Sequence, residues 1–88
     1  MPYIKKVERE CYEKAIDNLI SEMEFYETKA GGLNYILTKL IHGYVKVNSL
    51  NYQTLNDIVG VLESAKAEFQ RRVVNPYEDK KIDENGDL

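Results

Sequence analysis

The chain has 88 residues, a net charge of −3 and an apolar content of 43%. A chain of this length forms one domain and buries a smaller share of its surface than a larger protein does. The acidic balance argues against general nucleic-acid binding, which needs a basic excess. A single cysteine, Cys11, excludes an intramolecular disulfide framework and favours a cytoplasmic location. We expect neither a signal peptide nor membrane contact, because no apolar run has the required length.

A first helix is predicted from about Lys5 to Glu27, where apolar side chains recur at steps of three and four. They are Val7, Cys11, Ala15, Leu19, Met23 and Tyr26, with Tyr12, Ile16 and Ile20 beside them. Gly31-Gly32 predicts a break after this helix, because glycine readily adopts the positive φ that a helix end needs.

A second helix is predicted from about Asn34 to Lys46, with apolar side chains around more than half of its circumference. We therefore expect it to be covered on two sides. The stretch Leu33-Asn34-Tyr35 is repeated as Leu50-Asn51-Tyr52, and each Asn is predicted to cap the start of a helix by accepting from a backbone amide.

A third helix is predicted over residues 51–74, with a single apolar stripe. It consists of Leu55, Ile58, Val59, Leu62, Ala65, Phe69 and Val73. Asn75-Pro76 predicts its end, because Pro76 lacks an N–H and disfavours helical geometry at Asn75. Such a helix is roughly 36 Å long, whereas a compact chain of 88 residues has a radius of gyration of about 12 Å. This length favours self-association.

The fold class that follows is all-α: a three-helix bundle or helical hairpin, homo-oligomeric, with an extended C-terminal arm. We expect residues 1–77 to form the helical domain and residues 78–88, which hold five acids and two lysines, to form a charged arm or tail. The third helix should be central to the contact between copies.

Catalytic and metal-binding patterns are missing from the sequence. His42 and Cys11 lie on different predicted helices without carboxylates at ligand spacing, so we expect no metal site and no cofactor. Ser49 and Ser64 have no local catalytic arrangement, and Gly31-Gly32 lacks the lysine and hydroxyl of a phosphate loop. An enzyme, such as a helical nucleotide pyrophosphatase, is therefore disfavoured.

An anionic ligand is a better match to the charge pattern. Residues 31–56 contain no acid, and Arg71 and Arg72 add guanidinium groups, which bind phosphate through two N–H donors. In an oligomer of antiparallel helices these groups can meet at a subunit boundary. The predicted ligand-binding residues are Arg71, Arg72, Tyr77, His42, Tyr52, Asn51, Thr54 and Lys46. The alternative is that both arginines only oppose the helix dipole and that the tyrosines only pack.

Two long runs, Leu50–Glu63 and Glu68–Lys81, resemble a family of small uncharacterised proteins of bacteria and bacteriophages. The opening Met1-Pro2-Tyr3-Ile4-Lys5 and the closing Glu84-Asn85-Gly86-Asp87 are similar to this family too. The resemblance implies a phage or prophage protein of the host cytoplasm, and it transfers no site residue. By size and setting alone it resembles the small helical phage oligomers that inhibit host defence, some by sequestering signalling nucleotides.

The function expected from the sequence is therefore non-enzymatic binding by a small helical oligomer. In one version it sequesters a small anionic, nucleotide-like ligand and so inhibits host defence signalling. In the alternative, an exposed helix face caps or inhibits a host or phage protein.

Overall fold

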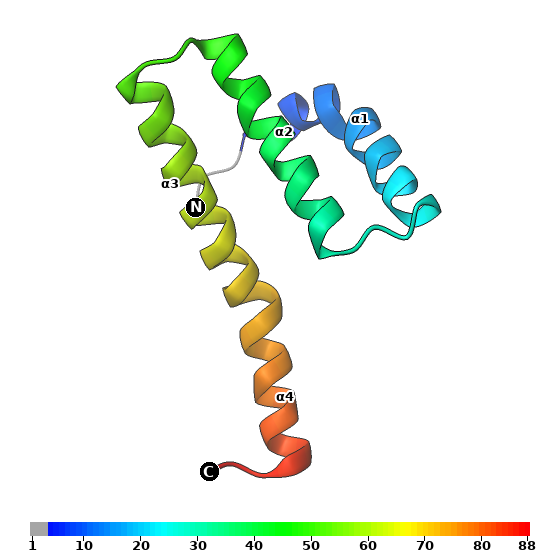
Figure 1. The fold of residues 1–88 in the computed structure, drawn as a ribbon. Helices are drawn as coiled ribbons and strands as arrows, with labels where there is room; N and C mark the ends of the chain where they lie inside the picture. Colours follow the sequence, from blue (N-terminus) through cyan, green and yellow to red (C-terminus); the bar gives the residue numbers. More distant parts are fainter. Residues whose placement is uncertain (1–3) are drawn as a thin grey trace. The chain divides into compact units, whose positions relative to one another are not determined.

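A computed structural model describes residues 4–88, which are helical throughout apart from short connections (Figure 1). Residues 1–3, which open the stretch that resembles the family, lie outside the described residues. The chain divides into two units at Val47 and Asn48. Each unit is described below by itself.

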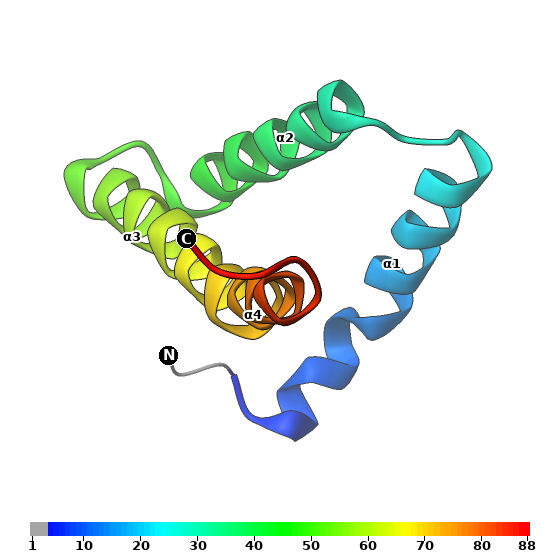
Figure 2. The ribbon, with the colours of Figure 1, turned by 90° about the horizontal axis from the view of Figure 1, so that it is seen from below.

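The first unit contains α1 (Lys6–Phe25) and α2 (Ala30–Asn48), whose last residue belongs to the second unit. Each includes most of a predicted helix. Among the described residues, α1 and α2 are not packed side by side, and they lead away from the loop that joins them (Figure 2).

The expected break at Gly31-Gly32 is wrong, since both glycines lie in the first turn of α2. The positive φ occurs earlier, at Glu27 with φ 52°, where the Thr28 amide donates to the Met23 carbonyl at 2.9 Å. Gly32 has a packing role instead, because a Cβ there would lie 2.9 Å from the Thr28 methyl group. Asn34 therefore lies inside α2 and does not cap it.

The second cap prediction is confirmed at the start of α3 (Tyr52–Phe69). Asn51 has extended backbone geometry, and its side chain accepts a hydrogen bond from the Thr54 amide at 2.9 Å. The Thr54 hydroxyl donates to the Asn48 carbonyl at 3.4 Å, and Thr54 is 5% exposed. These two bonds fix the chain direction at which α3 begins.

The predicted helix end at Asn75-Pro76 is wrong. A π-helical turn, η1 (Gln70–Val74), follows α3 directly, and α4 (Asn75–Asn85) follows η1 as a continuation of the same rod (Figure 1). The Asn75 amide donates to the Gln70 carbonyl, as expected for a π turn, and Pro76 occupies the first turn of α4. Proline is tolerated in that position because the missing N–H is not required there. The π turn therefore allows the helix to continue through Pro76.

The expected extended arm is also wrong over most of its length. Residues 75–85 are helical, and the helix ends at Gly86, whose φ of 88° suits glycine. Within α4 the Lys81 ammonium lies 3.2 Å from the Glu84 carboxylate.

No apolar residue in the described part of the chain is buried, so no hydrophobic core exists within it. Thr54 is the one residue between positions 4 and 88 that is buried. The apolar faces predicted from the periodicity are present on α1, α2 and α3, but their side chains are exposed or half-buried and none is buried. The three predicted helices form with different ends, whereas the contacts that normally stabilise amphipathic helices are missing within each described unit.

Candidate functional site

The two arginines of the predicted anion site lie next to each other on the π turn. Arg71 and Arg72 each donate from Nε to one oxygen of Glu68, Oε1, at 3.0 and 3.1 Å. The Arg71 Nη2 group contacts the same oxygen. The arginine side chains are 67% and 60% exposed, whereas the Glu68 side chain is 10% exposed beneath them. Two cationic groups therefore share one carboxylate oxygen.

The shared contact lowers the pKa of Glu68 from its ordinary value. The largest cause is the hydrogen bond from Arg71, followed by the hydrogen bond from Arg72. Both bonds stabilise the ionised carboxylate, so Glu68 stays charged at neutral pH and stays paired with the arginines.

This lowered pKa predicts an acid-dependent loss of stability. A carboxylate whose pKa is depressed by folding stabilises the protein above its unfolded-state value, near 4.5. The contribution is lost as the pH falls through the lower folded-state pKa. In thermal unfolding, we therefore expect the difference between the wild type and Glu68→Gln to be largest at neutral pH and to shrink below pH 4.5.

Glu63→Gln is the matched control, because Glu63 is also on α3 and the described structure shows no ion pair for it. The Glu63 variant should follow the wild type across the pH range. If the Glu68 variant did so as well, the two arginine contacts would have no effect on stability.

An open hollow of about 210 Å³ lies beside this cluster, lined by Ser64, Ala67, Glu68 and Arg71. Its lining presents a hydroxyl, a methyl group, the shared carboxylate and a guanidinium. Tyr77 lies further along the rod on α4 and is 60% exposed, with the Lys81 ammonium 5.5 Å from its ring centroid. The π turn and the first part of α4 thus present cationic and aromatic groups to solvent.

The other predicted ligand-binding residues of the second unit lie at the far end of the same rod. Asn51, Tyr52 and Thr54 are at the start of α3, and Tyr52 is almost fully exposed. Nineteen residues separate Tyr52 from Arg71, which corresponds to about 28 Å along a helix. One chain therefore does not bring the two groups of residues together. Thr54 is buried and both of its hydrogen bonds are used at the helix start.

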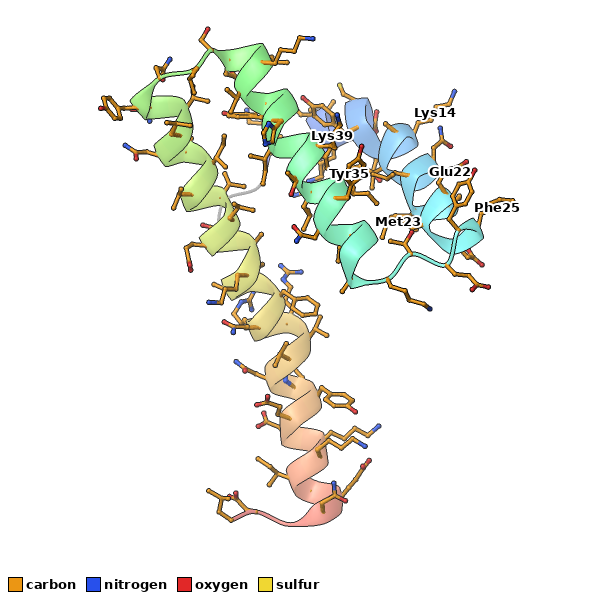
Figure 3. The ribbon with its side chains drawn as sticks, viewed as in Figure 1. Lys14, Glu22, Met23, Phe25, Tyr35 and Lys39 are labelled. Atoms are coloured by element: carbon orange, nitrogen blue, oxygen red, sulfur yellow. The ribbon has the colours of Figure 1, made fainter. Side chains whose placement is uncertain are left out.

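The remaining predicted residues, His42 and Lys46, are exposed on α2, which carries no acidic residue. Residues at steps of three and four share one helix face, which places Tyr35 and Lys39 on the same side. Figure 3 shows Tyr35 and Lys39 one turn apart along α2. Helix α2 therefore has a cationic and aromatic face opposite its apolar residues.

Glu68 is the functional residue that the sequence reading missed as a partner of the arginines. Its separations of three and four residues from Arg71 and Arg72 were the available signal, since side chains at these spacings are neighbours on a helix. In the described residues no group of three or more histidine, cysteine or acidic side chains is placed to hold a metal ion. None of the described helices is both long and apolar enough to cross a membrane.

Comparison with known families places the chain in one of them. A family model described as a domain of unknown function, DUF6899, matches residues 1–88. No curated protein and no solved structure matches the chain. The chain therefore belongs to the DUF6899 family, whose function is unknown.

Proposed function

We propose that this protein is a binding module that completes its hydrophobic core by associating with another protein chain. The observation that carries the proposal is the burial pattern, because the described helices are amphipathic and none of their apolar residues is buried. Such a protein acts by occupying a partner, and it needs no catalytic group.

The size of the exposed apolar surface supports this function. On α3, Val59 and Val61 are both more than 60% exposed, as are Phe25 and Tyr26 near the end of α1. Burial of apolar surface contributes about 25 cal/mol per Å². Large apolar side chains that are exposed together on a helix face are typical of interaction sites. A partner chain that covers these faces supplies the stabilising contacts that one chain lacks.

Thermal unfolding at several protein concentrations tests the proposal. Association with another copy, or with an added partner, stabilises the folded form by mass action, so Tm then depends on concentration. We expect Tm of the purified protein to rise by several degrees between micromolar and hundreds of micromolar concentrations. A cooperative transition with the same Tm at every concentration would mean that the single chain is stable without association.

A second function, binding of a small anionic, nucleotide-like ligand, is favoured by one specific observation. Arg71 and Arg72 stand side by side, are mostly exposed and both contact Glu68. π turns are frequent at functional sites, and paired guanidinium groups suit phosphate. If a phage encodes the protein, sequestration of such a ligand is a means to inhibit host defence signalling.

This second function is tested by thermal shift and calorimetry with inorganic phosphate and a panel of nucleotides. We expect a nucleotide to raise Tm, and the double variant Arg71→Ala/Arg72→Ala to weaken its binding by at least about 100-fold, because two charge-assisted contacts are lost. The variant Lys6→Ala/Lys14→Ala removes the same charge from α1 and should bind nearly as the wild type does. No stabilisation by any member of the panel, or equal losses in both variants, would refute a specific site at the arginines.

A further inference from the structure

The rod of α3, η1 and α4 carries one continuous apolar stripe that no other described element of its own unit covers. The stripe consists of Leu55, Ile58, Leu62, Ala65, Phe69, Val73 and Tyr77. Its large members other than Ile58 are 40% to 60% exposed. From Leu55 to Tyr77 it is about 33 Å long at the helical rise. A stripe of this length and narrow width is suited to pairing with one other helix.

We propose that the occupant of this stripe is a second copy of the same rod, packed antiparallel with Leu62 opposite the partner's Ala65. This inference rests on the proposed function and names its partner. The stripe and the flanking Val59 and Val61 expose on the order of 800 Å² together, which matches the roughly 800 Å² per partner of a specific interface. A second copy is therefore large enough to use the whole stripe.

The stripe is self-complementary in this register. When Leu62 lies opposite the partner's Ala65, Ile58 lies opposite the partner's Phe69. The two-fold axis repeats both pairs with the chains exchanged. A large residue then meets a small one at the centre, and the bulky pairs lie on either side, so that the helices can approach closely in the middle.

The π turn extends the match by one further layer. In an uninterrupted α-helix the position opposite the partner's Leu55 would be Arg72, whereas the extra residue of η1 places Val73 there. At about 100° of rotation per α-helical residue, Tyr77 would lie about 80° from the centre of the stripe in a regular α-helix. The extra residue of η1 brings Tyr77 to about 20° from that centre. Because the π turn keeps the apolar residues on one face across Pro76, we infer that this face contacts the partner helix over its whole length.

Charge selects the antiparallel direction. In a parallel pair, α4 would lie against its own copy, and its acids Glu78, Asp79, Asp83 and Glu84 outnumber Lys80 and Lys81, so two helices of net negative charge would be side by side. In the antiparallel pair, the start of α4 lies beside the partner's residues 48–56, which contain no acid. The helix dipoles are also opposed in this arrangement, which is favourable.

Antiparallel pairing brings together the two groups of residues that one chain keeps about 28 Å apart. By the same register, Tyr77 falls opposite the partner's Asn51, whereas Arg72 and the partner's Asn56 reach the same level along the rods but lie on the faces away from the stripe. The cationic, aromatic end of one rod then meets the amide-rich helix start of the other. Each end of the dimer thus places the π turn of one copy at the level of the helix start of the other.

Distances between identical spin labels test the register directly. In a Cys11→Ser background of the full chain, single cysteines replace Glu63 or Glu78, both exposed and polar, and carry a nitroxide label. Position 63 lies next to the two-fold axis, so its two labels should be close, at about the 10 Å spacing of packed helices plus the label arms. Position 78 lies far from the axis, so its labels should be about 40 Å apart.

The outcomes separate this inference from the proposed function. A short distance at position 63 with a long distance at position 78 supports the antiparallel pair. Equal short distances at both positions would overturn the register and leave association in place. No dipolar coupling at either position, together with a monomeric mass and cooperative unfolding, would overturn both the pair and the proposed function.

Discussion

Leu62→Glu is expected to abolish self-association of the chain. Leu62 lies at the centre of the apolar stripe and is 42% exposed in one copy, so the substitution places no charge in an existing core. In the proposed dimer two glutamates would lie near the two-fold axis, away from water and next to each other. If each costs about 2 kcal/mol or more, Kd rises at least about 1000-fold. Size-exclusion chromatography with light scattering should then show a single copy at concentrations at which the wild type is paired.

Asn56→Glu is the matched control, since it adds the same charge to the same helix about 140° away from the centre of the stripe. This variant should elute with the wild type. If Leu62→Glu left the mass unchanged, or if Asn56→Glu lowered it equally, the stripe would not be the contact surface. Circular dichroism of both variants shows whether a lower mass is accompanied by loss of helix.

Pro76→Ala is expected to convert the rod into a regular α-helix and to stabilise α4. Proline costs about 3 kcal/mol in a helix interior, and less in the first turn that Pro76 occupies. We therefore expect a gain of about 1 kcal/mol in the helical form, seen as slower amide exchange over residues 77–85. The π-type bond from the Asn75 amide to the Gln70 carbonyl should be replaced by α-type bonds, which NMR contacts between backbone protons distinguish.

The same substitution should weaken the dimer even though it strengthens the helix, because Tyr77 rotates out of the stripe and Arg72 takes the place of Val73. Lys80→Ala, which keeps Pro76, should change neither the stability of α4 nor the strength of the dimer much. Retention of the π turn in Pro76→Ala would mean that the pairing of Glu68 with the two arginines, and not the proline, maintains it.

Much of the helical structure was predictable from the spacing of apolar residues, because that spacing is a local property of the chain. The stripe of α3 and the cap at Asn51 were both recognised. The helix break was predicted at Gly31-Gly32 but lies earlier, because Glu27 adopts the positive φ. Gly32 is needed instead for the close approach of Thr28. A residue type that permits a conformation does not show which residue adopts it.

Pro76 illustrates a second limit. Proline normally ends a helix because its ring collides with the carbonyl four residues earlier and its N–H is missing. A π turn removes that conflict with one additional residue, and no simple sequence signal marks it. For this reason an extended arm was predicted for residues that form α4.

The candidate site was predictable in its residue types and not in its assembly. Arg71 and Arg72 are prominent as a pair, and Glu68 at three and four residues before them was a readable signal of an ion pair. One helical rod joins Asn51 to these arginines and fixes the distance between them. The helix end that was wrongly expected at Pro76 lies after the arginines, so it did not change this distance. Whether the two ends meet depends on a second chain, and intermolecular contacts leave no local pattern in one sequence beyond an exposed apolar face.

A second copy of the chain, in the proposed dimer, covers the apolar stripe of α3. Sedimentation equilibrium of the wild-type chain across micromolar concentrations measures this directly. We predict a mass that approaches twice 10.2 kDa as concentration rises, with dissociation on dilution. A mass of 10.2 kDa at every concentration, from a chain that still unfolds cooperatively, would contradict the pairing of two copies through this stripe.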